Sequence, residues 1–284
     1  MANISVESIA DCIRTKRPDL SVEINEVVKN KQTFQGLTIK SQSMNVAPNI
    51  YVEGYLEKFT TVDDIAEAIL NTYEEHKCFD GFNVADILNK DFILSHVIPV
   101  MQQESDEPLI KLPNVSERFK GAEAYLAIVS DADDNASYSV KLNPQILASA
   151  DINIDSDRLF EHAIENLKSK VVIKSMFETL KQMTGLPDEM LEPYDAPINM
   201  YVCSLGSKYK GASAILCDDA LTDFAKEHNI KDGFFILPSS VFETIFVWGD
   251  NIDIDSLSDM VVSVNENEVA PEDRLSDTAW FYML

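Results

Sequence analysis

The sequence has few basic residues for its length. Its 284 residues contain 23 Lys and Arg against 48 Asp and Glu, for a formal net charge of -25. Residues 1–60 are electrically neutral, so the whole excess of acid lies after them. Because binding to phosphates or anionic lipid needs clustered cations, we expect no direct nucleic-acid binding and no membrane attachment. The charge favours a basic protein partner, or serves only to keep the protein soluble.

Long hydrophobic runs are also missing. No apolar stretch approaches the ~20 residues that cross a bilayer. The first residues, MANISVESIADCIRTKRPDL, contain no basic leader followed by an apolar block. These absences predict a soluble, cytoplasmic protein.

Cysteine and histidine are scarce and scattered. The four cysteines form no C-x-x-C pair, which argues against a zinc ribbon or a disulfide scaffold. The four histidines form no H-x-x-x-H pair, so a metalloprotease site lacks support. The glycine-containing stretch SLGSKYKG lacks the G-K-[ST] of a phosphate loop, and we expect no cofactor. The residues concerned are Cys12, Cys78, Cys203, Cys217, His76, His96, His162 and His228.

One acidic stretch partly matches a calcium loop. Asp131, Asp133 and Asn135 reproduce the alternating oxygen ligands at the start of an EF-hand. Ala136 replaces the required glycine, however, and Leu142 stands where the bidentate glutamate belongs. The three oxygen-bearing residues are therefore only weak metal candidates.

Residues 1–185 predict an N-terminal region of mixed helices and strands. A short helix before Pro18 is followed by LSVEINEVV, FQGLTIKS and NIYVEGYL, which predict an antiparallel meander. TTVDDIAEAILNTYEEHK has a threonine N-cap, acids in its first turn and one apolar face, all typical of a helix. AEAYLAIVS and ASYSVKLN around DADDN predict a hairpin. DSDRLFEHAIENLKSK and VVIKSMFETLKQM then predict two helices, or one that bends near Lys170.

A Pro-rich acidic linker at residues 186–197 separates this region from a C-terminal subdomain, residues 198–284. The subdomain pattern predicts strands INMYVCSLG and GASAILC, a helix DDALTDFAKEHN, strands GFFILP and VFETIFVW, a helix DIDSLSDMVVSVNENE and a last strand DTAWFYML. This ββαββα unit with a terminal strand indicates an α+β fold, with mostly antiparallel sheets and helices packed on one face.

The stretch GFFILPSSVFETIFVWGDN holds the candidate catalytic residues Ser239, Ser240 and Glu243. A nucleophile elbow needs Gly-x-Ser-x-Gly between a strand and a helix, whereas these serines follow a proline and lead into another strand. Turn residues are the better interpretation of both serines. Glu243 shares a strand face with Ile245 and Val247, where an acid must pair or reach solvent.

Three stretches carry a resemblance to a known family: FFILPSSVFETIFV, VNENEVAPEDRLSD and AWFYML. Together they resemble an uncharacterised family of Firmicutes proteins, domain of unknown function 5688, over most of the chain. The resemblance implies L-P-S-S-x-H-E at the turn, and Phe242 stands here in place of that histidine. It also implies a bacterial cytoplasmic protein, often encoded among mobile-element genes, and it supplies no activity.

These observations favour a non-catalytic acidic protein-binding factor of bacterial or mobile-element origin. An anti-defence factor or a nucleic-acid mimic would be specific forms of it. The alternative is a hydrolase-type enzyme with its site near the turn Pro238-Ser239-Ser240 and Glu243, completed by groups from elsewhere in the chain. The sequence leaves the oligomeric state open.

Overall fold

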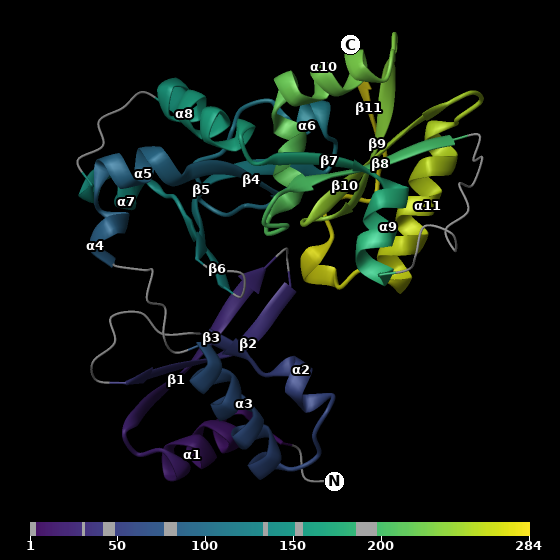
Figure 1. The fold of residues 1–284 in the computed structure, drawn as a ribbon. Coiled ribbons are helices and arrows are strands. Elements are labelled where there is room, and N and C mark those ends of the chain that lie inside the picture. Colours follow the sequence, from purple (N-terminus) through teal and green to yellow (C-terminus); the bar gives the residue numbers. More distant parts are fainter. Residues whose placement is uncertain are drawn as a thin grey trace. The chain divides into compact units, whose positions relative to one another are not determined.

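The computed structural model describes residues 4–29, 32–41, 49–76, 84–132, 136–150, 156–185 and 198–284. The chain forms two compact units, Met1–Asp86 and Ile87–Leu284 (Figure 1). Helices and three antiparallel sheets confirm the α+β class.

The first unit is a three-stranded antiparallel meander packed against helices. Its elements are α1 (Val6–Lys16), β1 (Leu20–Lys29), β2 (Gln32–Ser41), β3 (Asn49–Tyr51), α2 (Glu53–Leu56) and α3 (Val62–His76), and α4 (Val84–Ile87) lies at the boundary. The strand order is β1-β2-β3, as predicted. Thr61 precedes α3 and caps it, since its hydroxyl accepts a hydrogen bond from Asp64 N at 3.2 Å. Fully buried Ile9 of α1, Ile65 of α3 and Leu37 of β2 meet in the core.

The second unit contains two sheets. Its first elements are α5 (Lys90–His96), β4 (Val97–Gln103), α6 (Val115–Arg118), β5 (Ala122–Ala132), β6 (Ala136–Lys141), α7 (Pro144–Ser149) and α8 (Ser156–Lys168). The strands form the sheet β4-β5-β6, in which β5 and β6 are the predicted hairpin. Its later elements are β7 (Val171–Ser175), α9 (Met176–Thr184), β8 (Ile198–Leu205), the 3-10 helix η2 (Gly211–Leu216), α10 (Asp218–Glu227), β9 (Gly233–Ser240), β10 (Glu243–Gly249), α11 (Ile254–Asn267), η3 (Pro271–Asp273) and β11 (Trp280–Met283).

The five-stranded sheet has the order β11-β9-β10-β8-β7, and helices cover both of its faces. Phe234 of β9 and Phe246 of β10 pack with α10 in the main core. The alternate residues of the same two strands pack instead with Val261 of α11. Helices on both faces differ from the predicted one-sided cover, because the two strands are apolar on both faces.

Two predicted elements of the second unit have another structure. GASAILC is the buried 3-10 helix η2 rather than a strand. Gly211 lies against Ser204 Oγ and the carbonyl oxygen of Phe242, so any side chain there would collide. Residues 171–175 begin the predicted helix but form strand β7, since Ile173 pairs with Cys203 of β8.

The compact units divide the chain at a different place from the predicted boundary. Residues 186–197 lie outside the described residues, yet β7 before them and β8 after them are neighbours in one sheet. That pairing holds both sides of the predicted linker in the second unit, whereas the division observed falls between residues 86 and 87.

Candidate functional site

The end of strand β9 carries the residues that the sequence singles out. The pairing of β9 with β10 shifts between the pairs Leu237–Ile245 and Ser240–Glu243, which leaves one extra residue in β9. Pro238 lies in this β-bulge, where the missing N–H removes no ladder hydrogen bond. The sheet therefore accommodates a proline in a strand that has neighbours on both sides.

The turn itself consists of Val241 and Phe242 rather than the two serines. Ser240 Oγ accepts a hydrogen bond from Phe242 N at 3.1 Å and so supports the turn. The carbonyl oxygen of Phe242 accepts from Ser204 Oγ at 2.8 Å, and Val241 N donates to Asp273 O at 2.8 Å. Ser240 has a structural role in this geometry, and hydrogen bonds to two other segments, β8 and η3, fix the turn.

The described contacts do not assemble Ser239, Ser240 and Glu243 into a catalytic set. Of the histidines with a described side chain, His96 stacks on Phe92 and His162 lies exposed on α8. His228 packs between Tyr201 and Trp248 on the α10 side of the sheet. The hydrolase alternative needs a base beside the serines, and the described part of the chain brings none of these three rings there.

Ser239 instead lines an apolar groove of about 140 Å³ between α11 and the sheet. The other lining residues are apolar except Asn265. They are Met200, Leu237, Pro238, Ile245, Val247, Leu257, Met260, Val261, Val264 and Asn265. Asn265 donates to Ser276 O at 3.0 Å and to Asp277 Oδ1 at 2.7 Å, so its amide anchors α11. A volume this small suits a few side chains of a partner better than a free metabolite, whose pockets usually measure ~300–1,000 Å³.

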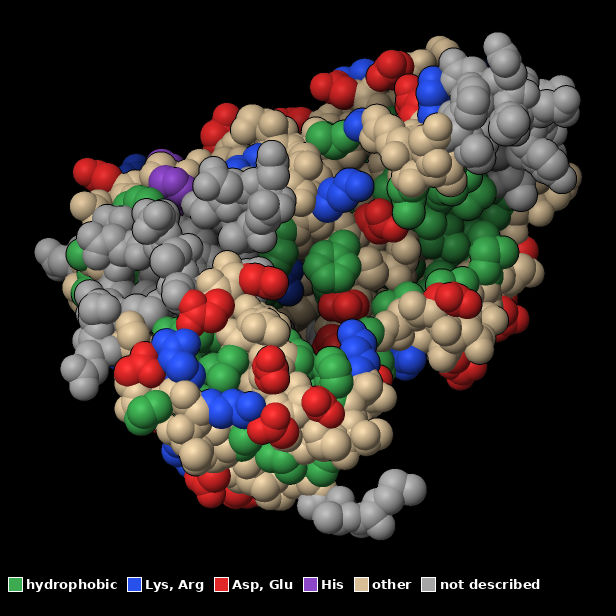
Figure 2. All heavy atoms as spheres, turned by 60° about the horizontal axis from the view of Figure 1, so that its bottom comes forward, with side chains coloured by type: hydrophobic (Ala, Val, Ile, Leu, Met, Phe, Trp, Pro, Cys, Tyr) green, Lys and Arg blue, Asp and Glu red, His purple; other side chains and the backbone are tan. Residues whose placement is uncertain are grey.

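The apolar surface continues from the groove towards α9. Lys174 of β7 donates to Gln182 of α9 at 3.2 Å. Lys174 pairs with Val202 of β8, and Val202 pairs with Ile245 of β10, which packs towards α11. Helix α9 therefore lies over the same face of the sheet as α11. None of the α9 residues is buried. Figure 2 shows hydrophobic side chains gathered in a broad patch at the right of the view. The exposed apolar residues of α9, β8 and α11 on this face are Phe177, Leu180, Met183, Met200, Met260 and Val264.

We call this surface, formed by the groove and those six residues, the apolar face of the second unit. Its methionines are unusually accessible: Met183 is 73% exposed and Met260 is 54% exposed. Exposed apolar patches on soluble domains usually mark interaction sites. Methionine in particular lines surfaces that adapt to differing partners, since its side chain is unbranched and polarizable.

Three of the elements that line the groove lie in a stretch of chain that has acids but no Lys or Arg. Residues 232–273, which form β9, β10 and α11, hold ten Asp and Glu and no Lys or Arg. Asp253 caps α11 by accepting from Ser256 N at 2.9 Å, and this hydrogen bond lowers the pKa of the carboxyl group. Residues 232–273 therefore give this part of the second unit a net negative charge.

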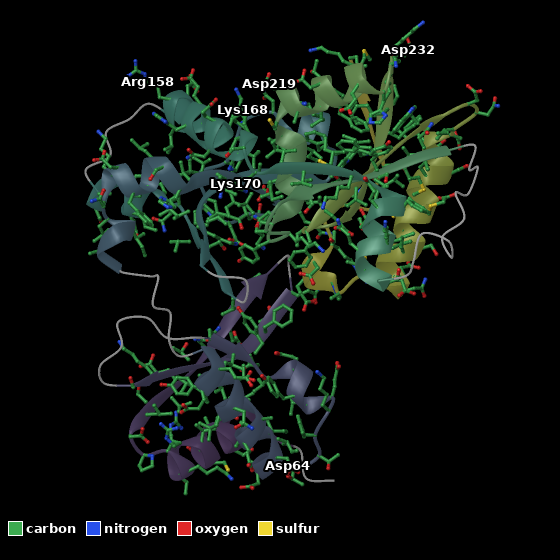
Figure 3. All side chains as sticks on the ribbon, in the orientation of Figure 1. Asp64, Arg158, Lys168, Lys170, Asp219 and Asp232 are labelled. Carbon is green, nitrogen blue, oxygen red and sulfur yellow. The ribbon has the colours of Figure 1, made fainter. Side chains whose placement is uncertain are left out.

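A second cavity, of about 420 Å³, lies between α6, α8 and the start of α10. Its charged lining residues are already paired with each other. Arg118 meets Asp218 at 2.5 Å and Lys168 meets Asp219 at 2.9 Å. Figure 3 shows Lys168 and Asp219 reaching towards one another from α8 and α10. The size would suit a small ligand, but a charged ligand would have to break these pairs, and we assign this cavity no function.

A buried acid in the β4-β5-β6 sheet is paired as well. Glu123 meets Lys111 Nζ at 2.7 Å and accepts from Gln102 Nε2 and Ser105 Oγ, both at 2.8 Å. Burial acts to raise the pKa of Glu123, but these donors outweigh it and hold the pKa below its usual range. The carboxylate stays charged and structural.

The calcium candidates lie mostly outside the described residues. Asp133 and Asn135 lie outside the described residues, and of Asp131 only the backbone, in β5, is described. Among the described residues no group of three His, Cys, Asp or Glu side chains is arranged to hold a metal ion. No helix in the described ranges has the length and apolar character to span a bilayer.

Comparison with known proteins gives a match to a family profile. The profile described as "Family of unknown function (DUF5688)" matches residues 5–283. No curated protein and no solved structure matches the chain.

Proposed function

The chain belongs to the DUF5688 family of unknown function, and since that membership supplies no activity, we propose from the site that the protein is a non-catalytic factor that binds a basic protein. One observation carries the proposal: an exposed apolar face adjoins 42 residues, 232–273, with ten acids and no Lys or Arg. Such a surface attracts cationic partners over long range and offers apolar contact area at short range.

The placement of acids on α11 supports a role in binding. Glu266 lies in the last turn of α11 and Glu268 is its C-cap residue, and that last turn holds no basic residue. The C-terminal end of a helix carries a partial negative charge, so carboxylates there cost stability. Acids kept at an unfavourable position are typical of surfaces that serve a partner rather than the fold.

The partner class follows from the charge. Proteins that handle nucleic acid carry clustered Lys and Arg, and an acidic surface can occupy their binding channel in place of phosphates. Within this proposal the protein is a bacterial or mobile-element factor, acting in the cytoplasm, that blocks such a protein by mimicry of nucleic acid. An anti-defence role is one form of it.

The test is co-purification of the tagged chain from lysate of its source organism at about 0.05 M and 0.5 M salt. We expect a basic protein that is retained at low salt and released at high salt. The triple variant Asp259→Asn, Glu266→Gln and Glu268→Gln should lose it, since the change removes three charges from the α11 surface.

A matched control removes three charges elsewhere. Glu23, Glu104 and Glu161 are exposed on β1, after β4 and on α8, so Glu23→Gln, Glu104→Gln and Glu161→Gln should retain the basic protein. Equal loss in both triple variants would show that net charge alone, and not this surface, holds the partner. Recovery of no basic protein at low salt would overturn the proposed function.

A further inference from the structure

The proposed function leaves open how a basic partner is recognised. The apolar face indicates the mode of recognition. Two helices, α9 and α11, lie over the same face of the five-stranded sheet (Figure 1). The sheet between them contributes Met200 and Ile245 to the groove. A floor of strands with a helix on either side has the shape that receives an elongated, convex element.

Three accessible methionines come from three different elements of this face. Met183 belongs to α9, Met200 to β8 and Met260 to α11. A groove lined by methionine accepts apolar side chains of varied shape without demanding one fixed fit. Helix-in-groove recognition uses such side chains, spaced three or four residues apart on one helix face.

The charge near the groove favours basic residues on the partner helix, beside its apolar stripe. Asp253, the N-cap residue of α11, lies one turn before Leu257, and Glu268, its C-cap residue, lies one turn after Val264, so these two acids flank the ends of the groove. A helix seated in the groove with Lys and Arg flanking its apolar stripe would place cations beside these carboxylates. An acidic segment would meet repulsion instead, and residues 186–197 of this chain hold four acids and no base.

We infer that the apolar face is a recognition groove and that its occupant is a basic amphipathic helix of the partner. The inference rests on the proposed function and narrows it. The acids supply long-range attraction and salt dependence, whereas the methionine-lined groove supplies the requirement for an amphipathic helix. Charge and groove thus make separable contributions to binding.

The probe is a synthetic Leu/Lys peptide of ~18 residues, about five helical turns, with leucines on one face. Its controls are a scrambled peptide of the same composition and a Leu/Glu peptide of the same pattern. Titration by fluorescence anisotropy should give tight, salt-sensitive binding of the amphipathic Leu/Lys peptide. The scrambled peptide should bind at least about tenfold more weakly, and the Leu/Glu peptide should not bind.

Variants locate the contact. Met260→Ala in α11 should weaken binding by about ten- to a hundredfold, the effect of losing one buried apolar side chain. Met183→Ala should act in the same direction, and alanine preserves both helices. Val28→Ala is the matched control, because Val28 of β1 is 54% exposed, as is Met260. Methyl NMR of labelled methionines should shift Met183, Met200 and Met260 on peptide binding while leaving the buried Met101 unchanged.

Each other result overturns the inference in a recognisable way. If scrambled and amphipathic Leu/Lys peptides bind equally and Met260→Ala has no effect, the acidic surface binds cations without a groove, and only the proposed function survives. If neither basic peptide binds, both fail. If light scattering shows a dimer and Met260→Ala dissociates it, the occupant of the face is a second copy of this chain. If a Gly/Ser replacement of residues 186–197 raises affinity sharply, that segment is the occupant.

Discussion

Removing one charge from either end of α11 should have opposite effects on stability. Glu266 lies in the last turn, near the negative end of the helix dipole, and Asp255 lies in the first turn, near the positive end. Glu266→Gln should therefore stabilise the second unit and Asp255→Asn should destabilise it. Each substitution keeps the size of the side chain and removes one negative charge, so the pair differs mainly in position.

The expected magnitude is about 0.3–1 kcal/mol for each change at low ionic strength. For a unit of this size that corresponds to about 1–4 °C in Tm. Calorimetry of the full chain at low salt would measure both variants, and about 1 M salt should remove most of the difference, because the dipole interaction is screened.

The outcome also separates the helix dipole from the overall charge. Relief of self-repulsion in a chain of net charge -25 would stabilise both variants alike. Equal increases in Tm would refute the dipole reasoning, and so would a decrease in the Glu266→Gln variant. If the prediction holds, loss of partner binding in that variant cannot be explained by unfolding.

Three further changes test the packing. Lys111→Met should leave the Glu123 carboxylate without its cation and cost about 1–3 kcal/mol in urea unfolding at pH 7. Because the folded pKa of Glu123 is depressed, the ion pair stabilises the fold at pH values above the unfolded pKa of about 4.3. This stabilisation fades as the pH falls through the folded pKa, so the cost of Lys111→Met should shrink below pH 4. A cost that stays constant with pH would contradict this reasoning. Gly36→Ala should destabilise the first unit by about 1 kcal/mol, since a Cβ there would push the Asn25 and Asn49 side chains away from their hydrogen bonds with Thr38 Oγ1, and an unchanged Tm for that unit would refute the crowding. Trp280→Phe should cost about 1–3 kcal/mol in the second unit through a lost hydrogen bond and a cavity, and tolerance within 0.5 kcal/mol would show that the site relaxes.

Elements with strong local signals were predictable from the sequence. Helix α3 combines a threonine cap, first-turn acids and an apolar stripe, and these agree with its packing. The faces of β10 were also predictable: Ile245 and Val247 pack towards α11 while Phe246 packs towards α10, as alternation requires.

Elements that depend on tertiary contacts were not. Residues 171–175 continue a helical spacing of apolar residues, yet they form β7 because β8 offers an edge with which to pair. Ser239 and Ser240 follow a proline and so suggest a turn. The bulge at Pro238 instead keeps them in β9 and moves the turn to the next two residues.

The candidate groove was beyond sequence reasoning for a related reason. Helical spacing places Met260, Val261 and Val264 on one apolar face of α11, and the structure keeps them there. Whether such a face is covered depends on what lies opposite: Val261 is buried, while Met260 is half exposed. Periodicity identifies apolar faces but not the ones left uncovered, so a binding surface and a core look alike in sequence.

The hydrogen bonds to Lys120 imply a delay during synthesis. Its carbonyl oxygen accepts from Ser276 Oγ at 2.9 Å and from Trp280 Nε1 at 3.0 Å, across 156 and 160 positions of chain. At about 5–20 residues per second, the ribosome needs roughly 8–30 s between making Lys120 and making its partners. Phe119 packs edge-on against Trp280 in the folded protein, and it lacks this contact throughout the interval. The first unit can fold early, but the second must wait, and in that time its apolar surfaces are available to chaperones.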